Sequence, residues 1–273
     1  MMTWEELLDL LKTSKSEKDI DSKRNEITEW IPQVERMFGY NQENSFHQYD
    51  LWMHSIHTVL TITKNITDDM LYLAALLHDI GKPDCKCYAK ENGKTNAHYP
   101  NHPEKSEQIV RDDIIPELVS KGVSLSQNDI KRLLYYVRFH NELVPVLSTI
   151  MTEHLKNVDI EAFTNLMVLQ IADASTQVRI PVVQLRIDVC SKWLELFDFP
   201  KFSESMTNDT EKCQIRKYQL FKKLNSDIEN FIHEFRPTYT DDEELIWLMM
   251  YLQFRMKEIN DKPYLRGVVS RKV

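Results

Sequence analysis

The chain has 273 residues, of which 42% are hydrophobic, so it can bury a substantial core and intrinsic disorder is not expected. Its 34 basic and 42 acidic residues give a formal charge of −8, which argues against broad, nonspecific binding of nucleic acids. Only 5 glycines are present, and neither G-x-G-x-x-G nor G-x-x-x-x-G-K-[ST] occurs, which excludes the Rossmann and P-loop classes of nucleotide-binding protein.

The cysteines and the N-terminal residues indicate the cellular compartment. The sequence has 4 cysteines, at positions 85, 87, 190 and 213, and this low number predicts reduced thiols rather than a disulfide framework. The first residues, Met1 to Glu6, are acidic where a signal peptide would be basic, and neither end carries an apolar run of about 18 residues. We therefore expect a cytoplasmic protein without membrane partners.

Apolar residues recur at helical spacing almost throughout, which predicts an all-α fold. The first predicted helices cover residues 4–12, 22–38, 47–65 and 67–81. Pro32 lies inside the second of them and is expected at a kink or in a first helical turn. The fourth begins at Thr67-Asp68-Asp69 and stops at Gly81, as a glycine followed closely by a proline commonly ends a helix.

The remainder of the chain also reads as helical, with one interruption. Residues 84–101 are rich in Asn, Gly and Pro and are predicted to form a polar loop. Pro103 suits the first turn of a helix that runs to about 120, and Ser126 with Asp129 resembles a capping box for a helix to about 140. A helix over 159–177 and about three more within 181–273 complete the prediction, and no break in composition marks a second domain.

Two acidic residues lie in strongly apolar helical segments. Asp79 follows the run from Leu71 to Leu77, and Asp173 lies in the run from Leu166 to Ala174. A buried carboxylate is costly unless it is paired or binds a cation, and both segments are poor in Lys and Arg. Histidines are available instead, at positions 54, 78, 102 and 140, each on or at the edge of a predicted helix. Imidazoles and carboxylates that converge from several helices on a divalent metal ion would satisfy these charges.

The same residues resemble the signature of the HD-domain superfamily of metal-dependent phosphohydrolases. His54, the pair His78-Asp79 and Asp173 match its motif, and the segments around His102 and His140 resemble its middle histidine segments. The resemblance covers about residues 40–177 and implies an HD-like helical bundle. We expect an N-terminal helical cap, this metal-binding core and C-terminal helices packed on the core, over residues 1–39, 40–180 and 181–273 respectively.

The entry to this region, Gln42 to His54, is similar to the HD domain of bacterial CCA-adding tRNA nucleotidyltransferases. No Gly-Ser head with paired aspartates is present, so the nucleotidyltransferase domain of those enzymes is absent and CCA synthesis is not implied. Asn101 replaces the glycine that usually precedes the middle histidine, and no Gly-Tyr-Pro motif follows, which argues against the cyclic-di-GMP phosphodiesterase branch.

The resemblance implies roles for individual residues. His54, His78, Asp79 and Asp173 are expected to bind one divalent ion, and His102 and His140 a second ion that Asp79 bridges. The mixed ligands favour Mn, Fe, Co, Ni or Zn over Mg. Asp79 and Lys82 are the expected catalytic residues, with Lys82 neutralising a phosphate oxygen, although Lys82 also suits a cation that compensates a helix C-terminus. His47, seven residues before His54, is expected on the same helical face and in contact with substrate.

These roles predict a hydrolase that cleaves a phosphomonoester or phosphodiester of a nucleotide, a 2′,3′-cyclic phosphate or an RNA 3′ end through a metal-activated hydroxide. Two alternatives remain open. In one, the chain is a catalytically silent HD-like module that binds a nucleotide and regulates a partner. In the other, the metal only stabilises the fold, so that its removal would unfold the chain.

Overall fold

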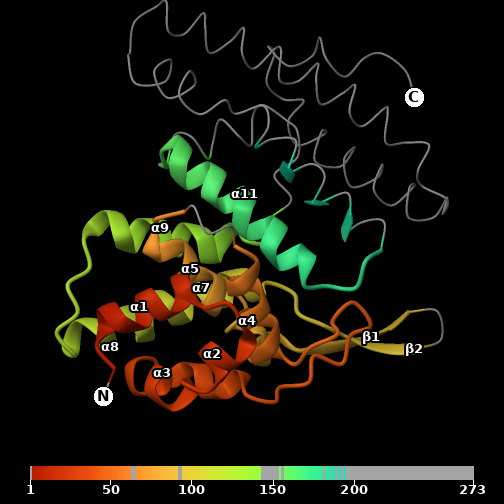
Figure 1. Ribbon diagram of the computed structural model, residues 1–273. Helices are drawn as coiled ribbons and strands as arrows, with labels where there is room; N and C mark the ends of the chain where they lie inside the picture. Colours follow the sequence, from red (N-terminus) through yellow and green to blue (C-terminus); the bar gives the residue numbers. More distant parts are fainter. Residues whose placement is uncertain are drawn as a thin grey trace, which may run out of the picture. The chain divides into compact units, whose positions relative to one another are not determined.

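Figure 1 shows the fold of the chain in a computed structural model, which describes residues 2–62, 66–91, 94–142, 154, 157–180, 183–184, 186–187, 190–191 and 194. The chain divides into two compact units, although no break in composition separates them. Residues 1–142 and 161–179 form one unit, and residues 143–160 and 180–273 form the other. Most of the C-terminal helices predicted within 181–273 lie outside the described residues. Within the described part of the chain, no helix is both long and apolar enough to cross a bilayer.

The described elements of the first unit follow one another along the chain as helices with one small sheet. They are α1 (Trp4–Thr13), α2 (Glu17–Asp21), α3 (Arg24–Trp30), the 3₁₀ helix η1 (Pro32–Met37), α4 (Leu51–Thr61), α5 (Asp69–Leu77), α6 (Lys82–Cys85), β1 (Cys87–Glu91), β2 (Lys94–His98), α7 (His102–Ile109), the π-helical turn η2 (Val110–Ile114), α8 (Ile115–Ser120), α9 (Gln127–Phe139) and α11 (Ile160–Ser175). The predicted all-α class is confirmed, with the two-stranded sheet as its one addition among these elements.

The N-terminal helices differ from the prediction at Pro32. α1 forms as expected, with a capping box between Thr3 and Glu6. The predicted single helix over 22–38 is instead α3 followed by η1, and Pro32 occupies the first turn of η1. Because proline has no N–H and disfavours helical conformation in the residue before it, the chain breaks at Ile31 rather than bending through a continuous helix.

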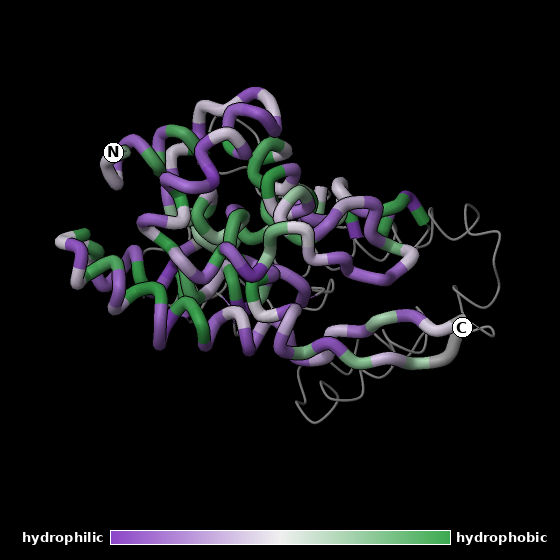
Figure 2. The backbone as a smooth tube through the Cα atoms, turned by 90° about the horizontal axis from the view of Figure 1, so that it is seen from below, coloured by the Kyte–Doolittle hydropathy of each residue, from purple (hydrophilic) through white to green (hydrophobic). Residues whose placement is uncertain are grey.

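α4 and α5 form the apolar centre of the unit. α4 is shorter than the predicted helix over 47–65, because Asp50 caps it by accepting a hydrogen bond from the backbone N–H of Met53 at 2.8 Å. In α5 the side chain of Asp68 caps the first turn, as the start signal predicted. Every residue from Met70 to Gly81 is buried. In Figure 2, hydrophobic and hydrophilic stretches alternate along the helices of this unit, as expected for amphipathic helices.

The predicted loop over 84–101 is wrong, because most of it forms an antiparallel hairpin of β1 and β2 that projects from the helices (Figure 1). Cys87 pairs with His98 at one end of the register and Glu91 with Lys94 at the other. The sequence carries Asn92-Gly93 between the strands, a dipeptide typical of two-residue hairpin turns. The loop prediction rests on the Asn, Gly and Pro content of this segment, and the strands are too short and too polar to show an apolar alternation.

The later helices agree with their sequence signals. Pro103 lies in the first turn of α7, and the helix continues to Ser120 through η2. The π-helical turn has a local cause, since Pro116 cannot donate to the carbonyl group four residues before it. The Ser126–Asp129 capping box at the start of α9 is confirmed.

α11 is joined to α5 and α9 by a hydrogen-bonded cluster around Asp68. Its Oδ2 accepts from the hydroxyl of Tyr136 at 2.6 Å, and from Arg132 and Asn165 at 3.1 Å each. The side chain of Asp68 is only 5% exposed, so these charge-assisted bonds lie largely out of water, where their geometry matters most. The cluster therefore sets the placement of α11 in this unit.

Gly81 lies where the turn after α5 meets α7. Its N–H donates to Oγ of Ser106 at 2.9 Å. A Cβ atom at Gly81 would lie 2.6 Å from the backbone nitrogen of Ser106 and 2.9 Å from the carbonyl oxygen of His102. Both contacts involve backbone, which cannot rotate away, so this position requires glycine for close approach.

The variant Gly81→Ala should therefore be destabilised by about 1–3 kcal/mol, because the added methyl group forces the two backbones apart. Chemical denaturation of the variant and the parent chain measures this loss. Ser106→Ala is the matched control, since it removes the hydrogen bond without adding volume and should cost about 1 kcal/mol. A Gly81→Ala chain as stable as the parent would show that the two backbones are not in tight contact.

Candidate metal centre

The candidate site combines side chains from four helices, or from residues next to their ends, with the two residues of one turn. His54 lies within α4, and His78 and Asp79 lie in the turn that follows α5. His102 is the first residue of α7, and His140 directly follows α9. Asp173 lies in the last turn of α11. All six side chains are buried. The structure therefore brings together every residue that the sequence predicted as a metal ligand.

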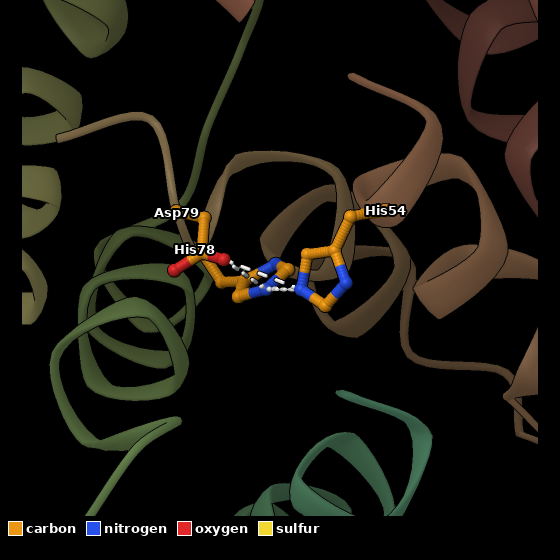
Figure 3. A group of neighbouring side chains, drawn as sticks. All are labelled: His54, His78 and Asp79. Atoms are coloured by element: carbon orange, nitrogen blue, oxygen red, sulfur yellow. Dashed lines mark hydrogen bonds and ion pairs between the residues drawn. The ribbon is translucent and has the colours of Figure 1, made fainter. Parts of the chain in front are cut away.

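These side chains form two clusters that share Asp79. The first cluster is His54, His78 and Asp79, and the second cluster is Asp79, His102 and His140; within each cluster the potential ligand atoms lie within 4.8 Å of one another. Figure 3 shows the first cluster, in which the two imidazole rings and the carboxylate turn toward a common centre. Asp173 lies beside the first cluster, with its Oδ1 3.1 Å from Nε2 of His54 and 3.8 Å from Nε2 of His78.

The rings of the site are oriented by hydrogen bonds at Nδ1. Nδ1 of His78, His102 and His140 lies 2.7 to 2.9 Å from the carbonyl oxygen three residues earlier in the chain, in Ala75, Tyr99 and Val137 respectively. A carbonyl oxygen only accepts, so the proton of each neutral ring lies on Nδ1. Nε2 then carries a lone pair that points into the site, as metal ligation requires.

The inward nitrogens face one another in pairs. Nε2 of His78 lies 3.3 Å from Nε2 of His54, and Nε2 of His102 lies 3.2 Å from Nε2 of His140. Two lone pairs at this distance repel when no proton lies between them, and a shared cation removes that repulsion. The chemistry of the donor set therefore fits a divalent metal ion in each cluster.

Asp79 supplies the negative charge at the centre. Neither of its buried carboxylate oxygens accepts a hydrogen bond of good geometry from the part of the chain that the structure describes. Burial opposes its ionisation, but His78, Lys82 and the rings of His102 and His140 hold its pKa well below the usual range. A carboxylate with one oxygen beside His78 and the other beside His102 fits a group shared between two cations.

The imidazoles respond differently to this environment. Burial lowers the pKa of His140 to about 4, so this ring is neutral at neutral pH. Burial also disfavours the charged form of His54, yet Asp173 and Asp79 raise its pKa overall. A cation bound in the first cluster would take the place of the proton on Nε2 of His54, and its positive charge would balance the carboxylates of Asp79 and Asp173.

Lys82 lies at the edge of the site and is only 4% exposed. Its Nζ lies 2.7 Å from Oδ2 of Asp79 and donates to Oε1 of Gln42 at 2.8 Å. It also lies 5.5 Å from the centroid of the Tyr99 ring. Lys82 is the first residue of α6, and its ammonium group contacts the carboxylate of Asp79. This ion pair explains why Lys82 is buried better than a role in compensating the C-terminus of α5 does.

His47 is close to the site, but not for the predicted reason. It precedes α4 and therefore does not share a helical face with His54, because Asp50 starts the helix. It pairs with Gln177 in an isolated antiparallel bridge, and its ring centroid lies 5.3 Å from that of His54. Its Nε2 lies 3.5 Å from Nζ of Lys82. The placement thus arises from the bridge to the chain after α11.

Sequence reasoning missed two residues that contact the site. Gln42 holds Lys82, and its amide nitrogen donates to the carbonyl oxygen of Tyr49. Thr176 contacts the ring of His54. Neither residue type indicates a metal site by itself, and both contacts depend on segments that are distant in sequence. Their burial, with Gln42 1% and Thr176 4% exposed, is visible only in the structure.

Comparison with known families agrees with this geometry. Residues 52–176 match the family model of the HD domain, a range that contains every candidate metal ligand. No curated protein and no solved structure gives a significant match to the chain. This match is to the HD domain alone and covers less than half of the chain, and nothing in it supports the narrower likeness to CCA-adding enzymes.

Proposed function

We propose that this HD-domain chain is a metal-dependent phosphohydrolase that cleaves a phosphomonoester or phosphodiester of a nucleotide, a 2′,3′-cyclic phosphate or an RNA 3′ end. One observation carries the proposal: a buried Asp79, whose pKa is held well below its usual range, lies between two pairs of histidines whose Nε2 atoms face each other. This arrangement is costly without cations, because it buries charge and opposes lone pairs. The HD superfamily supplies the reaction class.

His54, His78, Asp79 and Asp173 would hold one divalent ion, and Asp79, His102 and His140 would hold a second. A pair of bound divalent ions supplies Lewis acidity toward phosphoryl oxygens and lowers the pKa of a water molecule. Asp79 faces both clusters, because its Oδ2 lies 3.2 Å from Nε2 of His78 and its Oδ1 lies 3.1 Å from Nε2 of His102. Asp79 would therefore contribute to holding both ions.

Lys82 would bind a nonbridging phosphate oxygen in exchange for one of its three contacts, with Asp79, Gln42 or His47. Its ammonium is held beside Asp79 by Gln42 and is shielded from water, so its charge is weakly screened there. A cation placed in advance stabilises charge that develops on phosphate without reorganising in the reaction. Because the chain as a whole is acidic, this local cation would account for much of the attraction to substrate.

His47 would act as a neutral hydrogen-bond donor to substrate. Burial and the nearby Lys82 lower its pKa to about 2, so the ring is uncharged. Its Nε2 faces the ammonium of Lys82 and accepts there, which leaves the proton on Nδ1. Nδ1 is buried and has no hydrogen-bond partner among the described residues. A phosphate or ribose oxygen would reach this donor once the side chains that cover it move.

Metal analysis combined with a substrate panel tests the proposal. The purified chain should contain about two divalent transition-metal ions and hydrolyse at least one member of a panel of nucleoside monophosphates, 2′,3′-cyclic nucleotides and 3′-phosphorylated RNA oligonucleotides. Chelation should abolish turnover while far-ultraviolet circular dichroism stays unchanged, because the apolar core around α5 is built from side chains that are not candidate ligands. Unfolding on chelation would instead indicate a structural metal.

A metal-loaded chain that turns over no member of the panel would contradict the proposed activity. Tight nucleotide binding without product would favour the silent regulatory module. A chain that binds no metal would exclude both the hydrolase and the structural-metal interpretations.

A further inference from the structure

We propose that Thr176 is a positioning residue for the metal centre, which sets the tautomer of His54 and so makes its Nε2 available as a ligand. The inference rests on the proposed function, since it concerns how the same centre binds its ion. Thr176 follows α11 and is 4% exposed, and its hydroxyl lies 2.8 Å from Nδ1 of His54.

His54 needs a partner that the other ligand histidines do not need. His78 and His140 follow the ends of helices and His102 begins one, so each reaches a carbonyl group that precedes it by three residues. His54 lies inside α4, where the backbone carbonyl groups are engaged in the helix. Its Nδ1 therefore requires an acceptor from elsewhere in the fold.

The direction of the hydrogen bond follows from the second contact of the Thr176 hydroxyl. That hydroxyl lies 2.7 Å from the carbonyl oxygen of Asp173. Two oxygens at this distance need a proton between them, and the carbonyl cannot donate, so Thr176 gives its only hydroxyl proton to Asp173. The hydroxyl oxygen must then accept from Nδ1 of His54. The neutral ring consequently presents its lone pair at Nε2, toward Asp79 and Asp173.

The placement of Thr176 is itself secured by the segment that carries His47. The carbonyl oxygen of Thr176 accepts from the amide of Gln48 at 3.1 Å, and the backbone N–H of Val178 donates to the carbonyl oxygen of Phe46 at 2.9 Å. Gln177 donates to Oδ1 of Asp173 at 3.2 Å. The chain after α11 thus orients two candidate ligands at once, Asp173 through Gln177 and His54 through Thr176.

Replacing Thr176 with valine keeps the shape of the side chain and removes the acceptor. The ring of His54 is then free to carry its proton on Nε2, which blocks ligation. Loss of such an outer partner typically weakens metal binding 10- to 100-fold. We therefore expect Thr176→Val to bind cobalt(II) about 10- to 100-fold more weakly than the parent chain, and Thr176→Ser to bind within about threefold, because serine retains the hydroxyl.

The test is a titration of metal-free protein with cobalt(II), followed by the visible absorption of the bound ion. Thr58→Val is the matched control: Thr58 is also buried and contacts His54, but its hydroxyl donates to the backbone carbonyl oxygen, not to the ring. This control should keep the affinity of the parent chain. Equal affinity in Thr176→Val and the parent, or an equal loss in Thr58→Val, would overturn the inference.

A second measurement uses the unmodified chain, in case the valine variant does not fold. In the zinc-loaded protein with ¹⁵N-labelled histidine, long-range ¹H–¹⁵N spectra should show the proton of His54 on Nδ1; a proton on Nε2 would overturn the inference. If the parent chain binds neither cobalt nor zinc, both the positioning role of Thr176 and the proposed function fail. If it binds metal and only the Thr176 results disagree, the proposed function stands and the positioning role fails.

Discussion

Asp79→Asn should abolish metal binding and hydrolysis together, and it is expected to have the largest effect of any single substitution in the chain. Asparagine has nearly the same volume, but it removes the negative charge that both clusters share. Each site would then have to bind a divalent cation with fewer anionic ligands in a buried environment, where neutralising charge matters most. We expect metal content to fall by about tenfold or more and turnover by about 10³-fold or more.

The measurement is elemental analysis of the purified variant beside the parent chain, followed by assay on the best substrate of the panel. Asp129→Asn is the matched control, because Asp129 is a partly exposed residue of the capping box of α9 and belongs to neither cluster. It should retain metal and activity. Normal activity in Asp79→Asn would exclude the proposed mechanism.

Replacing a histidine of one cluster should affect one of the two ions only. His140→Ala removes a member of the second cluster alone, so it should lower the metal content by about one ion and leave the other bound. Loss of both ions from His140→Ala would show that the clusters do not bind independently.

Lys82→Met should lower kcat by about 10²- to 10³-fold while the metal stays bound, which is the second large effect. Methionine keeps an unbranched apolar stem in the same buried space and removes the ammonium group. If Lys82 binds a phosphate oxygen as its charge develops, the loss is expressed mainly in kcat. If Lys82 serves only to balance Asp79 in the folded protein, the variant should lose stability and keep its kcat.

Steady-state kinetics with thermal denaturation separates these outcomes. Lys86→Met is the matched control, since Lys86 lies on the same stretch of chain but pairs with Glu43, outside both clusters. This control should change kcat by less than about threefold, as expected for a screened ion pair near the surface. A similar loss of kcat in both variants would argue against a specific role for Lys82.

The hairpin shows why part of the fold escaped prediction. β1 and β2 pair regularly, yet their exposed residues alternate little in hydropathy, so periodicity gave no strand signal. The backbone carbonyl oxygen of Glu43 accepts from the backbone N–H of Ala97 at 2.9 Å, and the side-chain amide of Asn44 donates to the carbonyl oxygen of Ala97. These contacts with a segment about fifty residues earlier support the hairpin, and no local pattern reports them.

The sequence by itself determined the elements that carry the candidate ligands and the identity of those ligands. Helical spacing located α4, α5, α7, α9 and α11, capping residues marked several of their starts, and acids in apolar runs pointed to Asp79 and Asp173. These signals are local, because helix formation, capping and the cost of burying a charge depend on neighbours within a few residues.

Only the tertiary structure decided which atoms face each other. Asp79 lies between two histidine pairs, Gln42 holds Lys82, and Thr176 directs the ring of His54. These three arrangements depend on contacts between residues distant in the chain, from 23 positions apart for Asp79 and His102 to 122 for His54 and Thr176, and on the packing angle between helices. Such distances are set by how side chains fill the space between elements, and many sequences with the same helical periodicity would pack them differently.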